Sequence, residues 1–327
     1  MYIGDCGNNR IRKITASTSI ISTIAGTGVA GYIGNNGQAT AAAISCPNGI
    51  NLDSAGNVYF GDQTGYNVIR KITVSTGIIS TVAGTGSTSG GYNSDNIQAT
   101  AATLYYPVDV VFDSYNNLYI SDRGNNRIRK VDALTGVITT VVGTGVYSSS
   151  GDGSAASSAT IKGACFSRFD SAGNYYISEC GVYNIVDGGR IRKVLTVTTD
   201  IPTLAPSIQP TYYPSLSPHS ISVISTIAGT GTASFSGDND QATSAAINNP
   251  HGIVIDSSGN VYFSDSSNQR VRKITASTGI ITTYAGTSSG SYSGDGGVAS
   301  SAALNQPNGL CIDTSGNKYA SHHLPSY

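Results

Sequence analysis

The chain has 327 residues, a formal net charge of -1 and only 11% charged residues. A nearly neutral chain lacks the positive field that nucleic-acid binding needs, so we expect no nucleic-acid partner. It contains no apolar run long enough for a membrane span and no signal-peptide pattern. Its 40 glycines, abundant tyrosine and lack of tryptophan suit short strands and tight turns rather than helices.

The chain order predicts strands from the first residues onward. Residues 2–25 read as three short strands, and four complete units follow, each predicted to form four antiparallel strands, a to d. In the first complete unit these strands are residues 49–53, 58–62, 68–72 and 78–84. Gly-Asn between strands a and b, and Thr-Gly between c and d, tolerate the positive φ of tight hairpins. The chain ends with strands a and b of a further unit, in residues 309–321.

The units recur regularly, and the aspartate that ends strand a marks each one. Its intervals are about 60 residues, except for one of about 86 residues. Four antiparallel strands per unit are typical of a β-propeller, whose blades stack around an axis because one sheet cannot bury both of its faces. The marking residues are Asp53, Asp113, Asp170, Asp256 and Asp313.

The long interval contains an insertion. A few extra residues fall in the b–c loop before Arg190, and the rest replace the c–d turn at 195–220. This second piece is rich in proline, serine and threonine, so we expect an extended, poorly packed loop. O-glycosylation of the loop and a plain insertion are the two interpretations.

Residues 250–273 with 278–307, and residues 113–130, carry the pattern P-x-G-I-x-x-D-S-x-G-N-x-Y-x-x-D-x-x-N-x-R-I-R-K-I and its continuation. This pattern resembles the NHL repeat, in the longer subtype found in extracellular proteins. The resemblance implies a propeller, usually six-bladed, and a scaffold more than an activity. The sequence departs from the pattern at Val68, Ala164, Glu179 and His322.

The strand count leaves two ways of closing the ring. We expect residues 1–327 to form a single propeller, a fragment with six blade positions and incomplete ends. The alternative is five blades closed by joining the termini, which leaves one surplus strand b.

Each d–a loop contains an aromatic residue followed by an Asn or Asp turn, which offers a candidate binding face. The other interpretation is structural: each aromatic ring fills the gap between blades and each acid caps its own turn. Repetition in every unit favours the structural interpretation. The aromatic residues are Tyr32, Tyr92, Tyr147, Phe235 and Tyr292.

An acid ends strand b in five units, beside the first arginine of the R-I-R-K run (Arg10, Arg127, Arg190 and Arg270). We interpret these acids as structural ion pairs or turn caps, with an axial calcium site as the alternative. They are Asp5, Asp62, Asp122, Glu179 and Asp265.

No catalytic motif is present, and the four histidines have no metal-binding spacing. We therefore expect no enzyme and no cofactor. The five cysteines read as buried or incidental thiols, with one disulfide as an alternative. We expect a protein- or glycan-binding, or adhesion, scaffold outside the cell or at its surface. The alternative is a propeller hydrolase or lyase with an axial metal.

Overall fold

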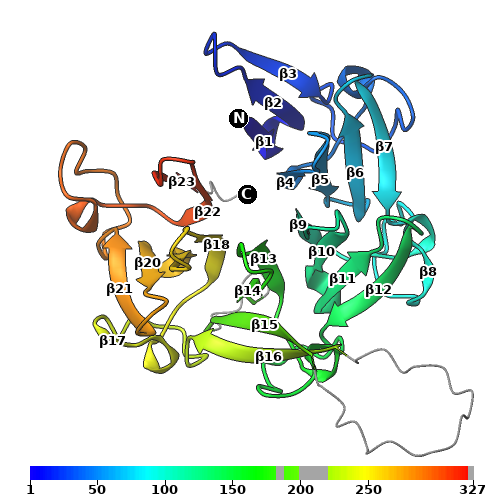
Figure 1. Ribbon diagram of the computed structural model, residues 1–327. Helices are drawn as coiled ribbons and strands as arrows, with labels where there is room; N and C mark the ends of the chain where they lie inside the picture. The colour runs from blue at the N-terminus through cyan, green and yellow to red at the C-terminus, as the bar shows by residue number, and fades with distance from the viewer. Residues whose placement is uncertain (182–187, 199–219, 323–327) are drawn as a thin grey trace, which may run out of the picture.

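The computed structural model describes residues 1–181, 188–198 and 220–322, in which every sheet is antiparallel and arranged around a common axis (Figure 1). The prediction of an all-β propeller with four-stranded blades is confirmed. No helix in these residues is long and apolar enough to cross a membrane; the helical segments are all three-residue 3-10 turns. These are η1 (Cys6–Asn8), η2 (Ala39–Ala41), η3 (Ala99–Ala101), η4 (Arg123–Asn125), η5 (Ala156–Ser158), η6 (Ala242–Ser244), η7 (Ser266–Asn268) and η8 (Ala299–Ser301).

Four complete blades follow one another along the chain. The first is β4 (Pro47–Leu52), β5 (Val58–Asp62), β6 (Val68–Thr73) and β7 (Ile78–Ala83). The second is β9 (Pro107–Phe112), β10 (Leu118–Asp122), β11 (Arg127–Val131) and β12 (Val137–Val142). The third is β13 (Ala164–Phe169), β14 (Tyr175–Glu179), β15 (Arg190–Thr198) and β16 (Ser220–Ala228). The fourth is β18 (Pro250–Ile255), β19 (Val261–Asp265), β20 (Arg270–Ile274) and β21 (Ile280–Ala285).

Partial sheets lie at the two ends of the chain. The first is β1 (Tyr2–Asp5), β2 (Arg10–Ile14) and β3 (Ile21–Ala25), and the last is β22 (Pro307–Ile312) with β23 (Lys318–His322). In the described part of the chain they are separate sheets. Together they hold the strands of a fifth blade plus one surplus strand b, which is the composition of the five-blade alternative.

A hydrogen-bonded turn fixes each a–b hairpin. In blade β9–β12, Asp113 Oδ1 accepts the backbone N–H groups of Tyr115 and Asn117 at 3.0 and 2.9 Å. Its Oδ2 accepts the Asn117 side-chain amide and the Tyr119 hydroxyl. Asn117 Oδ1 in turn accepts the backbone N–H of Ala133 in the c–d turn. The motif D-x-x-x-N-x-Y therefore ties both turns at one end of the blade together.

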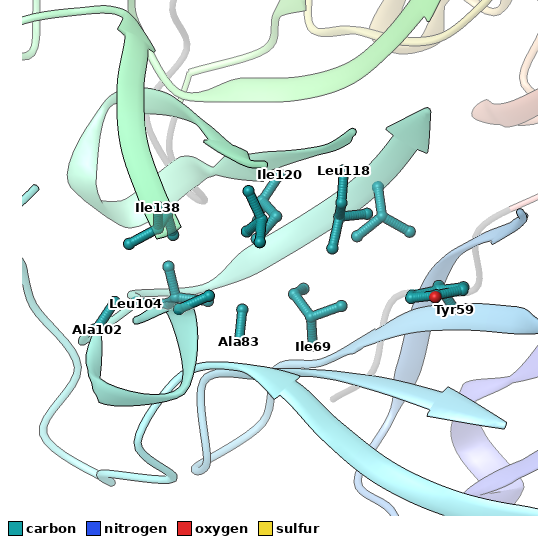
Figure 2. Packing of buried hydrophobic residues seen from close by; sticks show 11 residues of the cluster. Tyr59, Ile69, Ala83, Ala102, Leu104, Leu118, Ile120 and Ile138 are labelled. Atoms are coloured by element: carbon teal, nitrogen blue, oxygen red, sulfur yellow. The ribbon is translucent and has the colours of Figure 1, made fainter. Parts of the chain in front are cut away.

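The hydrophobic core lies between blades rather than within them. Figure 2 shows one such interface, where Ile69 and Ala83 of blade β4–β7 pack with Leu118 and Ile120 of the next blade. Equivalent clusters fill the other four interfaces in the described residues. The inner strands β4, β9, β13, β18 and β22 lie side by side around the axis.

Each d–a connection crosses the outer edge of the next blade. The short strands β8 (Ile97–Gln98) and β17 (Asp240–Gln241) pair with the outer strands β12 and β21. Single bridges, Gln38 to Ile78 and Ala155 to Val223, do the same for two other blades. This path carries the residues of each d–a loop over the c strand of the following blade.

Strands β15 and β16 border the long insertion. Their pairing continues to Thr198 opposite Ser220. The proline-rich segment predicted within 195–220 falls mainly at 199–219, and the extra b–c loop residues at 182–187; both ranges lie outside the described residues.

Candidate binding site

The arginine at the third position of the R-I-R-K run is buried in the four complete blades, whereas Arg12 in the first sheet is partly exposed. Arg129 is fully buried, and its Nη1 lies 3.6 Å from Asp122 Oδ2. The predicted partner, Arg127, instead donates to the backbone carbonyls of Asn125 and Thr144. The predicted pairing with the first arginine is therefore wrong, because that side chain reaches polar loop backbone while the buried one needs a carboxylate. The observed pairs are Arg12–Asp5, Arg70–Asp62, Arg129–Asp122, Arg192–Glu179 and Arg272–Asp265.

A second acid reaches the same arginine from the d–a loop. Asp95 Oδ1 lies 2.9 Å from Arg129 Nη2 and also accepts the Thr140 hydroxyl. In the same way Asp152 pairs with Arg192, and Asp238 pairs with Arg272, each a buried arginine of the following blade. The loop acids therefore bridge to the next blade, and the prediction that they cap their own turns is corrected.

The aromatic residues predicted to form one binding face lie in separate d–a loops, and most of them pack against arginine or lysine side chains. The Tyr92 ring centroid lies 3.9 Å from Arg127 Cζ and 4.9 Å from Arg129 Cζ. Phe235 covers Arg270 and Arg272 in the same manner, Tyr32 lies over Arg70, and Tyr147 lies near Lys162. The contacts of Tyr92, Phe235 and Tyr32 hold the d–a loop against the next blade, whereas Tyr147 and Lys162 lie in the same d–a loop. Tyr292 differs: it is 75% exposed, and its hydroxyl donates to Asp295.

Burial dominates the electrostatics of the strand-b acids. It raises the pKa of Asp62 and of Asp122 to about 6, and the nearby arginines oppose the rise. Burial also raises the pKa of Glu179 and Asp265. Each acid lies in its own blade, and in the described residues no three His, Cys, Asp or Glu side chains gather as metal ligands.

The repeat is broken on two neighbouring inner strands. Asp109 of β9 stands where other units have Gly49, Gly252 and Gly309, and it is fully buried. Its Oδ2 lies 2.9 Å from Arg168 Nη1 on β13 and accepts the backbone N–H of Ser167. Burial raises the pKa of Asp109, and the Arg168 guanidinium opposes the rise. An unlike pair of charges therefore joins two blades beside the axis.

This pair leaves hydrogen-bonding capacity unused. Asp109 Oδ1 and the hydroxyl of Ser121, its cross-strand neighbour on β10, are buried and have no hydrogen-bond partner among the described residues. Arg168 is about one-quarter exposed and uses Nη1 for both of its hydrogen bonds, to Asp109 and to the Ser167 carbonyl. Buried polar groups are normally satisfied, so this pair carries unused hydrogen-bonding capacity beside the axis.

A second unlike residue lies just after strand b. Arg123 follows Asp122, where other units have Gln63, Cys180 and Ser266. It is almost fully buried, and its Nε and Nη2 donate to the Gly181 carbonyl of the next blade at 3.1 and 2.7 Å. The sequence prediction did not identify Asp109, Arg123 or Arg168. Their departure from the repeat was the signal that could have found them.

Two disulfides correct the prediction of free thiols. Cys6 pairs with Cys46, and Cys165 pairs with Cys180. The first joins a b–c loop to the start of the next blade, and the second joins the two inner strands of one blade. Cys6 and Cys46 are 40 positions apart, and Cys165 and Cys180 are 15 apart. Each pair meets because the fold brings a loop to an inner strand. Cys311 is a free, exposed thiol.

Comparison with known proteins identifies the repeat. The NHL repeat matches residues 104–131, and the teneurin NHL domain matches residues 221–291. The chain is a β-propeller that contains NHL repeats. This NHL propeller is 25% identical to mouse teneurin-4 over 84% of its own length and 10% of teneurin-4. It is 23% identical to the Arabidopsis thaliana chloroplastic protein SUPPRESSOR OF QUENCHING 1, over 98% of its own length and 28% of that protein.

Solved structures share the fold of this NHL propeller. A Bacteroides thetaiotaomicron protein of unknown function has a TM-score of 0.61 at 18% identity, covering 98% of this chain and 63% of that one. An auxiliary nutrient binding protein from the same organism has a TM-score of 0.58 at 14% identity, over 94% and 60%. A streptogramin B lyase has a TM-score of 0.51 at 15% identity, over 98% and 71%. Because the same fold serves binding proteins and an enzyme, it does not determine the activity.

Proposed function

We propose that this NHL propeller is a non-catalytic binding scaffold, and that the axial pair Asp109–Arg168 forms part of the site for a protein or glycan ligand. The observation that carries the proposal is the position of the unlike residues. The repeated aromatic, arginine and acid groups contact one another between blades. The unlike charges lie on the inner strands β9 and β13.

The chemistry of Arg168 supports recognition of a ligand. Its guanidinium is held by a fully buried carboxylate, so its orientation is fixed before a ligand arrives. Nε and Nη2 have no hydrogen-bond partner among the described residues, and their fork suits a carboxylate or a pair of carbonyl oxygens. A positioned cation with free donors is what a binding site requires.

The two disulfides support a location outside the cell or at its surface. Disulfides form and persist in oxidising compartments and are rare in reducing ones. The proposed ligand is therefore an extracellular or cell-surface protein or glycan.

Binding to printed arrays of glycans and of extracellular protein domains tests the proposal. A double variant, Asp109→Gly with Arg168→Val, restores residues that other units carry at these positions and is expected to fold. We expect it to lose the ligand that the parent protein binds. Leu134→Ala, at a c–d turn residue that is 96% exposed, is the control and should keep binding. Equal binding by the parent and the double variant would overturn the axial site.

The alternative, a hydrolase or lyase with an axial metal, is addressed by metal analysis of the purified protein. We expect no stoichiometric calcium or zinc. A bound metal that is lost in the Asp122→Asn variant would support the enzyme instead.

A further inference from the structure

A hollow lies between blades β4–β7 and β9–β12, away from the axial pair. Its volume is about 410 Å³, within the usual range of about 300–1,000 Å³ for small-ligand sites. Residues of both a–b turns and of the c–d turn of β9–β12 line it. Its lining includes Tyr59, Lys71, Phe112, Leu118 and Asp132.

The next interface along the ring differs from this one in its aromatic contacts. Tyr59 and Phe112 meet edge to face with ring centroids 4.9 Å apart. Their counterparts between β9–β12 and β13–β16, Tyr119 and Phe169, meet at the same 4.9 Å. There, however, the Tyr175 ring stacks on Phe169 at 4.5 Å.

Leu118 occupies the position of Tyr175 in the hollow interface. Figure 2 shows Leu118 opposite Ile69, with Tyr59 at the end of the row of apolar side chains. Leu118 is smaller than Tyr175 and lines the hollow.

The hollow interface also carries polar groups that the filled one lacks. Asn116 and Asp132 line the hollow, where the filled interface has Gly173 and Leu195. Asn116 Oδ1 accepts the backbone N–H of Ser54 across the interface, while its amide nitrogen has no hydrogen bond within the described residues. Asp132 receives three hydrogen bonds on Oδ1 and none on Oδ2 within the same residues. An amide donor and a carboxylate acceptor therefore line the same hollow as the aromatic residues.

The charge of the hollow disfavours an anion. Lys71 Nζ lies 3.8 Å from Asp53 Oδ2, so these two charges offset each other. Asp132 then leaves one negative charge. Aromatic rings that pack against C–H groups, beside unused amide and carboxylate groups that bind hydroxyls, suit a neutral polyhydroxylated ring.

We propose that the hollow between β4–β7 and β9–β12 is a binding site for a neutral saccharide unit. This site is separate from the axial pair and does not depend on the proposed axial function.

Titration of the whole chain with neutral monosaccharides and disaccharides, followed by ligand-observed NMR, tests the proposal. We expect saturable binding by the parent. Leu118→Tyr, which copies the residue of the filled interface, should weaken binding at least tenfold. Leu52→Tyr adds a tyrosine to the preceding blade at the strand-a position that corresponds to Phe112, and it should bind like the parent.

Asn116→Gly provides a second variant. Asn116 has a φ of +63°, and the corresponding residues Gly56, Gly173 and Gly259 have φ values near +80°, so glycine is accommodated there. We expect several-fold weaker binding from the loss of the side-chain amide.

Three outcomes would overturn the site: no saturable binding at millimolar sugar, binding that survives both Leu118→Tyr and Asn116→Gly, or tighter binding of glucuronate than of glucose. The axial double variant should bind sugar like the parent. This result separates a failure of the hollow from a failure of the axial site.

Discussion

Two adjacent blades pair their buried arginine with different numbers of acids. In β9–β12 the buried Arg129 lies between Asp122 and Asp95. In β4–β7 the buried Arg70 has only Asp62, at 3.5 Å, because Asn35 stands where the other loop carries an acid. Nη2 of Arg70 has no hydrogen-bond partner in the part of the chain that the structure describes. Each complete blade therefore has one buried pair, while the second acid is present in some blades and absent from others.

Removing each arginine should have the largest effect and should separate the two blades. Arg129→Met leaves two acids without their cation, and we expect a loss of about 3–5 kcal/mol in the free energy of unfolding. Arg70→Met leaves one acid, so we expect a smaller loss of about 1–3 kcal/mol. Urea unfolding at pH 7 measures both losses. Equal losses would show that the second acid contributes nothing.

Exchanging the loop residues should change stability in opposite directions. Asn35→Asp supplies Arg70 with a second acid, and we expect a gain of about 1 kcal/mol or less because the position is exposed to solvent. Asp95→Asn should lose a similar amount, since it leaves Arg129 with Asp122 alone. Melting temperatures of both variants at low and high salt measure the effect. A gain from Asn35→Asp that persists at high salt would argue against an ion pair as its cause.

The pH dependence should be the smallest effect. The pKa values of Asp62 and Asp122 are raised to about 6, so the folded state binds protons more tightly than the unfolded state between pH 4 and 6. Their contribution to stability therefore grows as the pH falls from 7 toward 4, and we expect the melting temperature to hold or rise by a few degrees.

Below that range a second set of acids reverses the trend. The turn acids have lowered pKa values, so their contribution is lost as the pH falls below 4. Melting curves from pH 7 to pH 3 test both parts. A steady fall between pH 7 and pH 5 would contradict the assignment for Asp62 and Asp122. The turn acids are Asp53, Asp170, Asp256 and Asp313.

The sequence by itself determined the repeat, the strands and the turns. These depend on neighbours in the chain: Asp113, Asn117 and Tyr119 make their turn within seven residues, and Gly259 takes the positive φ that its turn predicts. Alternating apolar residues then require blades that stack, because a single sheet would leave one apolar face exposed.

Only the tertiary structure decided which groups meet between blades. Asp95 reaches Arg129, and Asp109 reaches Arg168, across boundaries that the local pattern does not encode. The disulfides and the space beside Leu118 have the same origin, because they depend on how one blade is placed against the next. Local hydrogen bonds fix a repeat, but burial and packing between repeats select the partner of each charge and the interface that is left unfilled.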